Sequence, residues 1–308
     1  MANDKNFIIK NGLQAGRYLQ TGGTETAGTG AGYDIANASY DSVSLDVTAQ
    51  DGTPRSIVFN NDGTKLYMLG SVNGRIYQYS LSTAYDLSTA SYDTFKGVQD
   101  ATPTSVAFNN DGTKLYTLGI TSDNIYQYSL STAFDISTLS YDSVSFSINA
   151  QSGVADEILF NDDGTKLYML ASGNDTIFQY SLGTAFDIST LSYDSVSFSV
   201  ASQDTSPFGM TFNNNGTKLY VCGSQNDSVY QYSLSTAYGL NTLAYDSISF
   251  NVSSQETTPR GISFNADGTK MYMVGSTNDT IYQYSTVGYT QTLDLSSGNT
   301  SITFATKY

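Results

Sequence analysis

The chain has 308 residues, only 13% of them charged, with a formal net charge of −15 and no histidine. An acidic surface repels phosphate backbones and anionic lipid, so we expect neither nucleic acid nor a membrane as a partner. The absence of histidine excludes the Ser-His-Asp and Cys-His nucleophile systems and removes imidazole as a metal ligand. We therefore expect no catalytic residue, no metal and no cofactor.

The first 32 residues combine a few apolar side chains with a Gly/Thr-rich stretch at residues 22–32, which has the composition of a flexible linker. The apolar side chains are Phe7, Ile8, Ile9, Leu13 and Tyr18. The run Phe7-Ile8-Ile9 is too short for a secretory signal or a membrane span. Two interpretations stay open: a flexible tail, or an anchor that becomes ordered only on a partner.

From residue 40 the sequence repeats itself five times. A Tyr-Asp pair recurs with steps of 52, 49, 52 and 52 residues, and a [D/N]-G-T-K turn recurs in phase with it. The pairs begin at Tyr40, Tyr92, Tyr141, Tyr193 and Tyr245. A fixed period of this length indicates one supersecondary unit used repeatedly, because a single unit cannot bury its own apolar faces.

Each unit reads as four antiparallel strands. In the last unit, short β-branched and aromatic runs at 261–264, 269–274 and 280–285 alternate with turns that contain Asp-Gly or Asn-Asp. Earlier units add a longer connection and a fourth strand, as in residues 141–147. Four such strands per unit form a propeller blade, and no segment shows the 3.6-residue period of a long helix.

The two ends of the repeat region complement each other. Residues 33–48 copy the connection and fourth strand of a unit, whereas the last unit has three strands and no fourth. We expect the strand near Tyr40–Val47 to pair with the strand near Thr280–Ser285, which leaves no exposed edge. The fold class is therefore all-β: a single five-bladed β-propeller over 33–285, closed by an N-terminal strand, with an N-terminal segment (1–32) and a C-terminal β extension (286–308). The strands expected at Gln291–Leu295 and Ser301–Phe304 would pair with the N-terminal segment or with a neighbouring copy.

Two resemblances follow from these motifs. The F-N-x-D-G-T-K-[LM]-Y units resemble the tandem repeats of the YVTN and lactonase-like propeller superfamily. That resemblance implies the fold; lactonase-like hydrolases use a central metal with acidic and often histidine ligands, and this sequence offers no matching set. The segments DKNFIIKNGL (4–13) and TLDLSSGN (292–299) resemble segments of tail-fibre and other structural proteins of tailed phages, marine ones especially. This second resemblance implies a virion protein attached through its N-terminal segment.

Positions that differ between units are the candidates for function. Just before the innermost strand the equivalent residues are Arg55, Thr104, Asp156, Phe208 and Arg260, and Glu157 follows Asp156. If these side chains ring the central channel, they form a small polar ligand site; the alternative is that an arginine merely pairs with Asp156 or Glu157. A glycosidase would need carboxylates from separate blades, and no such pair is present.

Repeated positions are interpreted as structural. The paired tyrosines of the third strands should pack between blades, with carbohydrate stacking as the alternative, and Cys222 should be a small core residue. The [D/N]-G-T-K turns should be hairpins rather than calcium sites, because the spacing of known calcium loops is missing.

The leading functional hypothesis is a non-enzymatic virion structural protein of a phage: a tail fibre, spike or head decoration on the particle exterior. It would bind other virion proteins through Phe7, Ile8, Ile9, Leu13 and Tyr18, be oligomeric in the assembly, and display the propeller to a host-surface glycan or receptor. The alternatives are a bacterial surface or secreted binding module and a propeller hydrolase.

Overall fold

The computed structural model describes residues 18–20, 32–286 and 303–305. The chain divides into two compact units, of which residues 31–286 form the larger. In the smaller unit, β1 (Tyr18–Gln20) pairs antiparallel with β22 (Thr303–Ala305). A C-terminal strand thus pairs with the N-terminal segment, as expected for the stretch around Phe304. The stretch Gln291–Leu295 lies outside the described residues.

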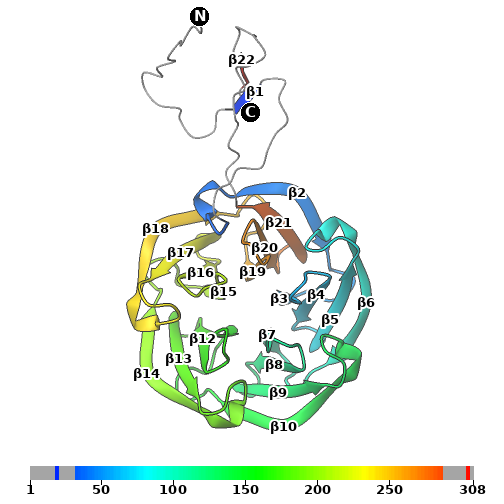
Figure 1. Cartoon of the computed structure of the whole chain (residues 1–308), viewed down its shortest axis with the longest axis vertical. Coiled ribbons are helices and arrows are strands. Elements are labelled where there is room, and N and C mark those ends of the chain that lie inside the picture. Colours follow the sequence, from blue (N-terminus) through cyan, green and yellow to red (C-terminus); the bar gives the residue numbers. More distant parts are fainter. Residues whose placement is uncertain (1–17, 21–31, 287–302, 306–308) are drawn as a thin grey trace, which may run out of the picture. The chain divides into compact units, whose positions relative to one another are not determined.

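The larger unit consists of five four-stranded antiparallel sheets arranged around a central axis, which confirms the predicted five-bladed propeller (Figure 1). Blade 1 contains β3 (Pro54–Phe59), β4 (Lys65–Gly70), β5 (Arg75–Leu81) and β6 (Ala90–Gly97). Blade 2 contains β7 (Pro103–Phe108), β8 (Lys114–Gly119), β9 (Asn124–Leu130) and β10 (Leu139–Ser147). Blade 3 contains β11 (Glu157–Phe160), β12 (Lys166–Ala171), β13 (Thr176–Leu182) and β14 (Leu191–Ser199). Blade 4 contains β15 (Pro207–Phe212), β16 (Lys218–Gly223), β17 (Ser228–Leu234) and β18 (Leu243–Asn251).

Blade 5 is assembled from both ends of the repeat region, as the complementary fragments predict. Its strands are β19 (Pro259–Phe264), β20 (Lys270–Gly275), β21 (Thr280–Ser285) and β2 (Ser39–Asp46). In this blade β2 pairs antiparallel with β21, with Tyr40 opposite Tyr284. The Nζ atom of Lys270 lies 2.5 Å from Oδ2 of Asp41, which ties the first repeat fragment to the last. The ring closes because the pairing strand comes from the other end of the sequence.

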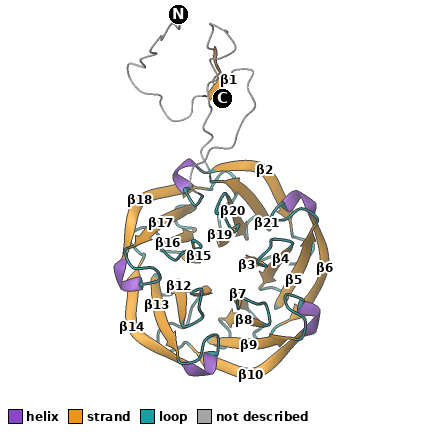
Figure 2. Ribbon diagram, viewed as in Figure 1, coloured by secondary structure: helices purple, strands orange, loops and turns teal. Residues whose placement is uncertain are grey.

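The helices of the described residues are single 3₁₀ turns in the connections that precede the outer strands (Figure 2). They are η1 (Ile35–Asn37), η2 (Leu87–Thr89), η3 (Ile136–Thr138), η4 (Ile188–Thr190) and η5 (Leu240–Thr242). An aspartate caps the first four; in η1 the Ala36 amide donates to Oδ1 of Asp34 over 3.0 Å. None of these helices is long and apolar enough to cross a membrane.

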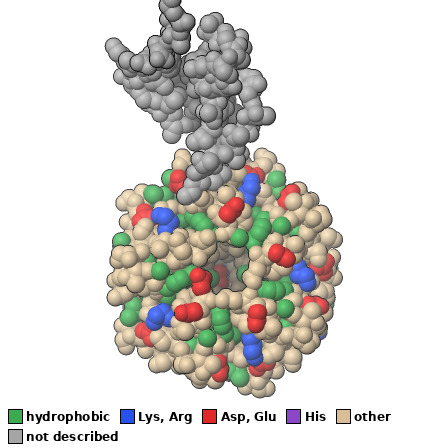
Figure 3. All heavy atoms as spheres, in the orientation of Figure 1, with side chains coloured by type: hydrophobic (Ala, Val, Ile, Leu, Met, Phe, Trp, Pro, Cys, Tyr) green, Lys and Arg blue, Asp and Glu red, His purple; other side chains and the backbone are tan. Residues whose placement is uncertain are grey.

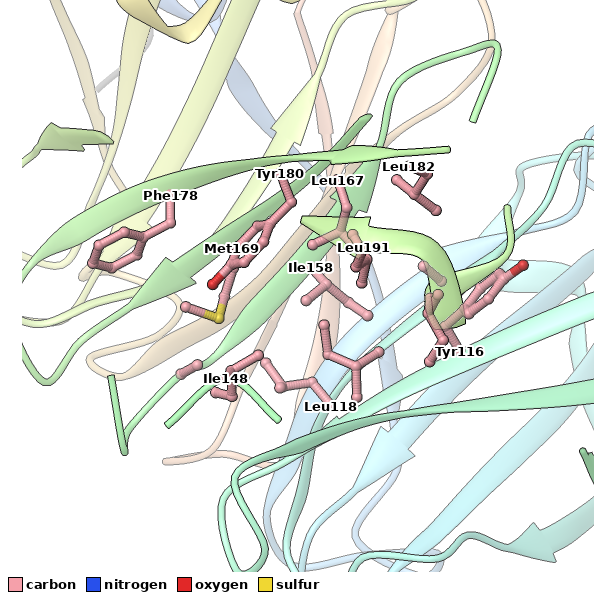
Figure 4. Close-up of a cluster of buried hydrophobic side chains, with 14 of the residues drawn as sticks. Tyr116, Leu118, Ile148, Ile158, Leu167, Met169, Phe178, Tyr180, Leu182 and Leu191 are labelled. Carbon is pink, nitrogen blue, oxygen red and sulfur yellow. The ribbon is translucent and has the colours of Figure 1, made fainter. Parts of the chain in front are cut away.

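Apolar side chains fill the spaces between neighbouring blades. Between blades 2 and 3, Tyr116 and Leu118 from β8 pack against Ile158, Leu167 and Met169 from blade 3 (Figure 4). A hydroxyl of the second strand also links each blade to the next: Tyr272 donates to the carbonyl of Tyr85 over 2.5 Å. The same bond joins Tyr67 to Phe134, Tyr116 to Phe186, Tyr168 to Tyr238 and Tyr220 to Tyr33. Burial between blades is therefore the main stabilising contact of the ring.

The 49-residue step of the sequence has a structural cause in blade 1. In β10 the register with β9 skips Asp142 and Ser143, whereas in β6 the register with β5 skips only Asp93. Compared with blades 3 and 4, the outer strand of blade 1 is therefore shorter by one residue, and the loop that follows it is shorter by two. A slip of one residue exchanges the faces of a strand, so Phe95 is 43% exposed and lies under the guanidinium of Arg75, 4.2 Å away.

Candidate functional site

The channel along the propeller axis is bounded by the five inner strands. The channel end at which these strands begin carries Arg55, Asp156, Phe208 and Arg260, and we call these four residues the arginine mouth. The turns between the second and third strands, such as residues 71–74, lie at the same end because the strands alternate in direction. The residues that vary most between repeats therefore gather at one face.

Two glycines bring the arginines of the mouth together. A Cβ atom on Gly209 would lie 2.4 Å from the carbonyl oxygen of Arg260, and one on Gly261 would lie 2.9 Å from that of Arg55. Only glycine allows backbones to approach this closely. The inner strands of blades 4, 5 and 1 are thus in tight contact, and Phe208, Arg260 and Arg55 follow one another around the mouth.

Each arginine of the mouth is hydrogen-bonded to a serine through its Nε atom. Nε of Arg55 donates to Oγ of Ser71 over 3.1 Å, and Nε of Arg260 donates to Oγ of Ser276 over 3.1 Å. The guanidinium carbon of Arg260 lies 3.8 Å from the centre of the Phe208 ring, a cation–π contact. Among the described residues neither guanidinium makes an ion pair within 4.0 Å, since the four pairs found there join lysines to aspartates. The interpretation in which an arginine pairs with Asp156 or Glu157 is therefore wrong for direct contact.

The positive charges of the mouth are only partly compensated. Burial, with the nearby charge of Arg55, lowers the pKa of Arg260 to about 10, and burial also lowers the pKa of Arg55. Asp156 lies close enough for both arginines to act on it. Its Oδ2 accepts a hydrogen bond from the Ser172 amide over 3.1 Å, yet burial prevails and raises its pKa. Two guanidinium groups thus face one carboxyl group.

Glu157 lies deeper in the channel than the arginine mouth. Its carboxyl group is hydrogen-bonded to the hydroxyls of Ser105 and Ser56, from blades 2 and 1, the latter at 3.4 Å. The residue is 4% exposed, and desolvation raises its pKa well above the ordinary value. The hydrogen bonds from the serines act against this rise of the pKa, and burial prevails.

The remaining predicted ligand residue, Thr104, has a structural role. Its hydroxyl donates to the carbonyl of Ala155 over 3.0 Å, and the residue is buried. Six residues were proposed from the sequence as a ligand site. The structure brings four of them together in the mouth: Arg55, Asp156, Phe208 and Arg260. It places Thr104 in the wall of the channel and Glu157 in the channel itself.

At the opposite end the channel opens into a hollow of about 430 Å³. Val58, Leu159, Thr211 and Ser263 line it from four inner strands, and asparagines of the first turns form its rim. The space-filling view shows the ring hollowed at its centre, with acidic and basic side chains distributed around the opening (Figure 3). This end differs from the arginine mouth because phenylalanines, tyrosines and amides line it.

The repeated positions behave as structural residues. Tyr79, Tyr128, Tyr232 and Tyr284 are buried between blades, which confirms packing and leaves them unavailable for carbohydrate stacking. Cys222 is buried, as predicted. In the first hairpin turn, Asp62 accepts from the amide and the hydroxyl of Thr64. Among the described residues no group of three or more acidic or cysteine side chains could hold a metal ion.

The predicted anchor residues Phe7, Ile8, Ile9 and Leu13 lie outside the described residues, and Tyr18 begins β1.

Buried acids at the mouth face were missed from the sequence. Asp51, Asp100, Asp204 and Glu256 each accept hydrogen bonds from amides of the turn after the second strand, as in Asn73 to Asp51 at 3.0 Å. A glycine ends the second strand in these blades, because a Cβ on Gly70 would lie 2.3 Å from Asp51. Blade 3 has Ser152 and Ala171 at these two positions. Blade 3 therefore lacks the acid and the glycine together, and this paired change between the repeats was the signal that could have identified the buried acids.

Comparisons with protein-family models and with curated proteins find no match. Among solved structures, a protein from Bacteroides fragilis NCTC 9343, provisionally named a 6-phosphogluconolactonase, has a TM-score of 0.51 at 12% identity, covering 82% of both chains. A similarly named protein from Bacteroides uniformis ATCC 8492 has a TM-score of 0.48 at 15% identity over 74% of this chain and 65% of that one.

A protein from Desulfotomaculum acetoxidans DSM 771 has a TM-score of 0.45 at 15% identity, covering 72% of this chain and 62% of that one. The chain thus spans less than two thirds of the length of two of these structures. At such identities the likeness establishes the β-propeller fold alone, and activity has to be argued from the site.

Proposed function

We propose that this chain is a non-enzymatic virion structural protein of a phage whose propeller is displayed for binding. The observation that carries the display role is the position of the two ends of the propeller. The amide of Tyr33 donates to the carbonyl of Gly268 over 2.6 Å, and that of Thr286 donates to Thr269 over 3.0 Å. Both ends therefore leave the propeller at the turn between β19 and β20, on the face opposite the arginine mouth. An anchor built from the chain ends would leave the mouth face free.

The mouth face has the character of a binding surface. Besides the arginine mouth it carries Val72 and Val154, which are 64% and 44% exposed and are the most exposed aliphatic side chains among the described residues. Arginine, an aromatic ring and exposed aliphatic side chains are typical of protein and ligand interfaces. Asp156 and Glu157 are both buried and come from the same blade, which supports binding rather than acid–base chemistry by carboxylates from separate blades.

The attachment role is tested by removing residues 1–32. The truncated chain should fold, because β2 and the rest of the propeller are retained, yet it should fail to enter assembled particles. Circular dichroism and thermal melting report folding, and immunodetection in purified particles reports incorporation. Incorporation of the truncated chain at the level of the full chain would contradict the anchor.

The display role is tested in particles that carry the full-length chain with Arg55→Ala and Arg260→Ala together. These particles should assemble normally and adsorb poorly to host cells. Arg75→Ala is the control on the same face, because Arg75 begins β5 directly after the turn at residues 71–74 and stacks on Phe95 instead of lining the channel. Normal adsorption of the double variant would show that the mouth is only structural.

A further inference from the structure

We infer that the arginine mouth binds a ligand through a carboxylate group that lies between Arg55 and Arg260. This inference rests on the proposed binding role of the propeller and names the chemistry of its ligand. The strongest support is the arrangement of the two cations. They come from neighbouring blades, and the close backbone contacts at Gly209 and Gly261 hold them next to each other.

The arrangement is costly unless an anion completes it. Two half-buried like charges destabilise each other: burial is the larger cause of the lowered pKa of Arg260, and the charge of Arg55 lowers it further. Among the described residues the serines bond only the Nε atoms, so both terminal nitrogens of each guanidinium remain for a ligand. Planar guanidinium groups bind carboxylates by two parallel hydrogen bonds, which is the geometry offered here.

The charge of the mouth favours a ligand with one negative charge over a ligand with two. Asp156 compensates part of the charge of the two arginines, so a monoanion matches what is left, whereas a phosphate dianion would meet the carboxyl group of Asp156. Phe208 adds an apolar ring that fixes the plane of Arg260 and offers a face to the body of the ligand. A sugar acid combines a carboxylate with hydroxyls for Asp156 and a ring for Phe208, and it is the class of ligand that we assign.

The experiment is calorimetric titration of the full chain with glucuronate at low ionic strength, with glucose and inorganic phosphate as comparison probes. Glucuronate should bind, glucose should not, and phosphate should bind at least tenfold more weakly than glucuronate. Because hydrogen bonds to charged groups contribute about 1.5–3 kcal/mol each, Arg55→Gln and Arg260→Gln should each weaken binding by about tenfold or more. Added salt should weaken it further.

Arg75→Gln is the matched control, since it also removes an arginine stacked on a phenylalanine, but one that does not line the channel. Arg260→Lys keeps the charge and loses the planar fork, so it should bind more weakly than the unaltered chain. Melting curves establish that each variant is folded. The inference is overturned if glucuronate does not bind, if phosphate binds more tightly, or if Arg75→Gln weakens binding as much as the mouth variants. Particle incorporation of the chain lacking residues 1–32 tests the anchor independently.

Discussion

At the scale of single residues, one repeated position beside the channel takes two different roles. Ser56, Ser105, Glu157, Gly209 and Gly261 are equivalent in sequence, yet the two glycines allow neighbouring backbones to approach and the other three residues are joined by hydrogen bonds. The role at each blade therefore depends on the neighbours that pack against it near the axis.

Replacing Glu157 with glutamine should change how stability depends on pH. In the folded protein burial raises the pKa of this carboxyl well above the ordinary 4.5, so its favourable contribution is complete below that ordinary value. The contribution is lost as pH rises through the folded pKa, because the unfolded chain then releases the proton more readily. Glu157→Gln keeps a neutral hydrogen-bonding group, so it should equal the unaltered chain at pH 4 and exceed it at pH 9. Thermal melting over this range is the measurement; parallel pH curves would contradict it.

Replacing Gly209 with alanine should destabilise the propeller. The added Cβ would lie 2.4 Å from the Arg260 carbonyl oxygen, which is backbone and has no room to move. Overpacking of this kind costs about 1–3 kcal/mol. Gly97→Ala is the control, since nothing lies within 4 Å of its added Cβ. Urea unfolding of both variants measures the difference, and equal midpoints would show that blades 4 and 5 are not in tight contact.

At the scale of elements, blade 5 is the blade that closes the ring. It is the one blade whose strands come from both ends of the repeat region, and its outer strand β2 contributes the closing ion pair between Lys270 and Asp41. Every other blade is continuous in sequence. Because each blade buries its faces only against its neighbours, the contact that closes the ring completes the burial of the first and the last.

Removal of residues 1–48 should open the ring at blade 5. The deletion removes β2 and the connection that carries Ile35, which is fully buried, and it exposes the edge of β21. An unpaired edge of β-branched and aromatic residues is an aggregation site. We expect lower solubility and a broadened, lower melting transition, whereas removal of residues 1–32 should leave melting unchanged. Identical melting of both truncations would mean that β2 does not close the ring.

At the scale of the whole molecule, residues 33 and 286 lie on the propeller face opposite the arginine mouth. Both are hydrogen-bonded to the turn between β19 and β20, and the positions that differ between repeats lie at the other end of the channel. Glu157 lies between the arginine mouth and the opposite hollow, where its carboxyl group is hydrogen-bonded to serines of blades 1 and 2.

Titration with zinc or manganese should give no heat of specific binding. Zinc prefers thiolate and imidazole ligands, but the chain has no histidine and its one cysteine is buried, with a pKa raised by burial to about 12. Manganese prefers carboxylates, and among the described residues no group of three or more acidic side chains could hold a metal ion. Calorimetry on chelator-treated protein is the measurement, with calcium titrated in parallel. A stoichiometric zinc site would revive the propeller hydrolase hypothesis.

The sequence by itself determined the number of blades, the strands of each blade and the closure, because these follow from a repeat period, alternating patterns and two complementary fragments. It also marked Arg55, Asp156, Phe208 and Arg260 as different from their equivalents. Only the tertiary structure decided what those differences do. Only the closed ring brings the two arginines side by side, because the backbone contacts at Gly209 and Gly261 join blades 4, 5 and 1. Asp156 and Glu157 are adjacent in sequence and both buried, yet Asp156 accepts a hydrogen bond from an amide of its own blade whereas Glu157 accepts from hydroxyls of blades 1 and 2. These partners are far apart in the sequence, so only the packing of the blades determines them.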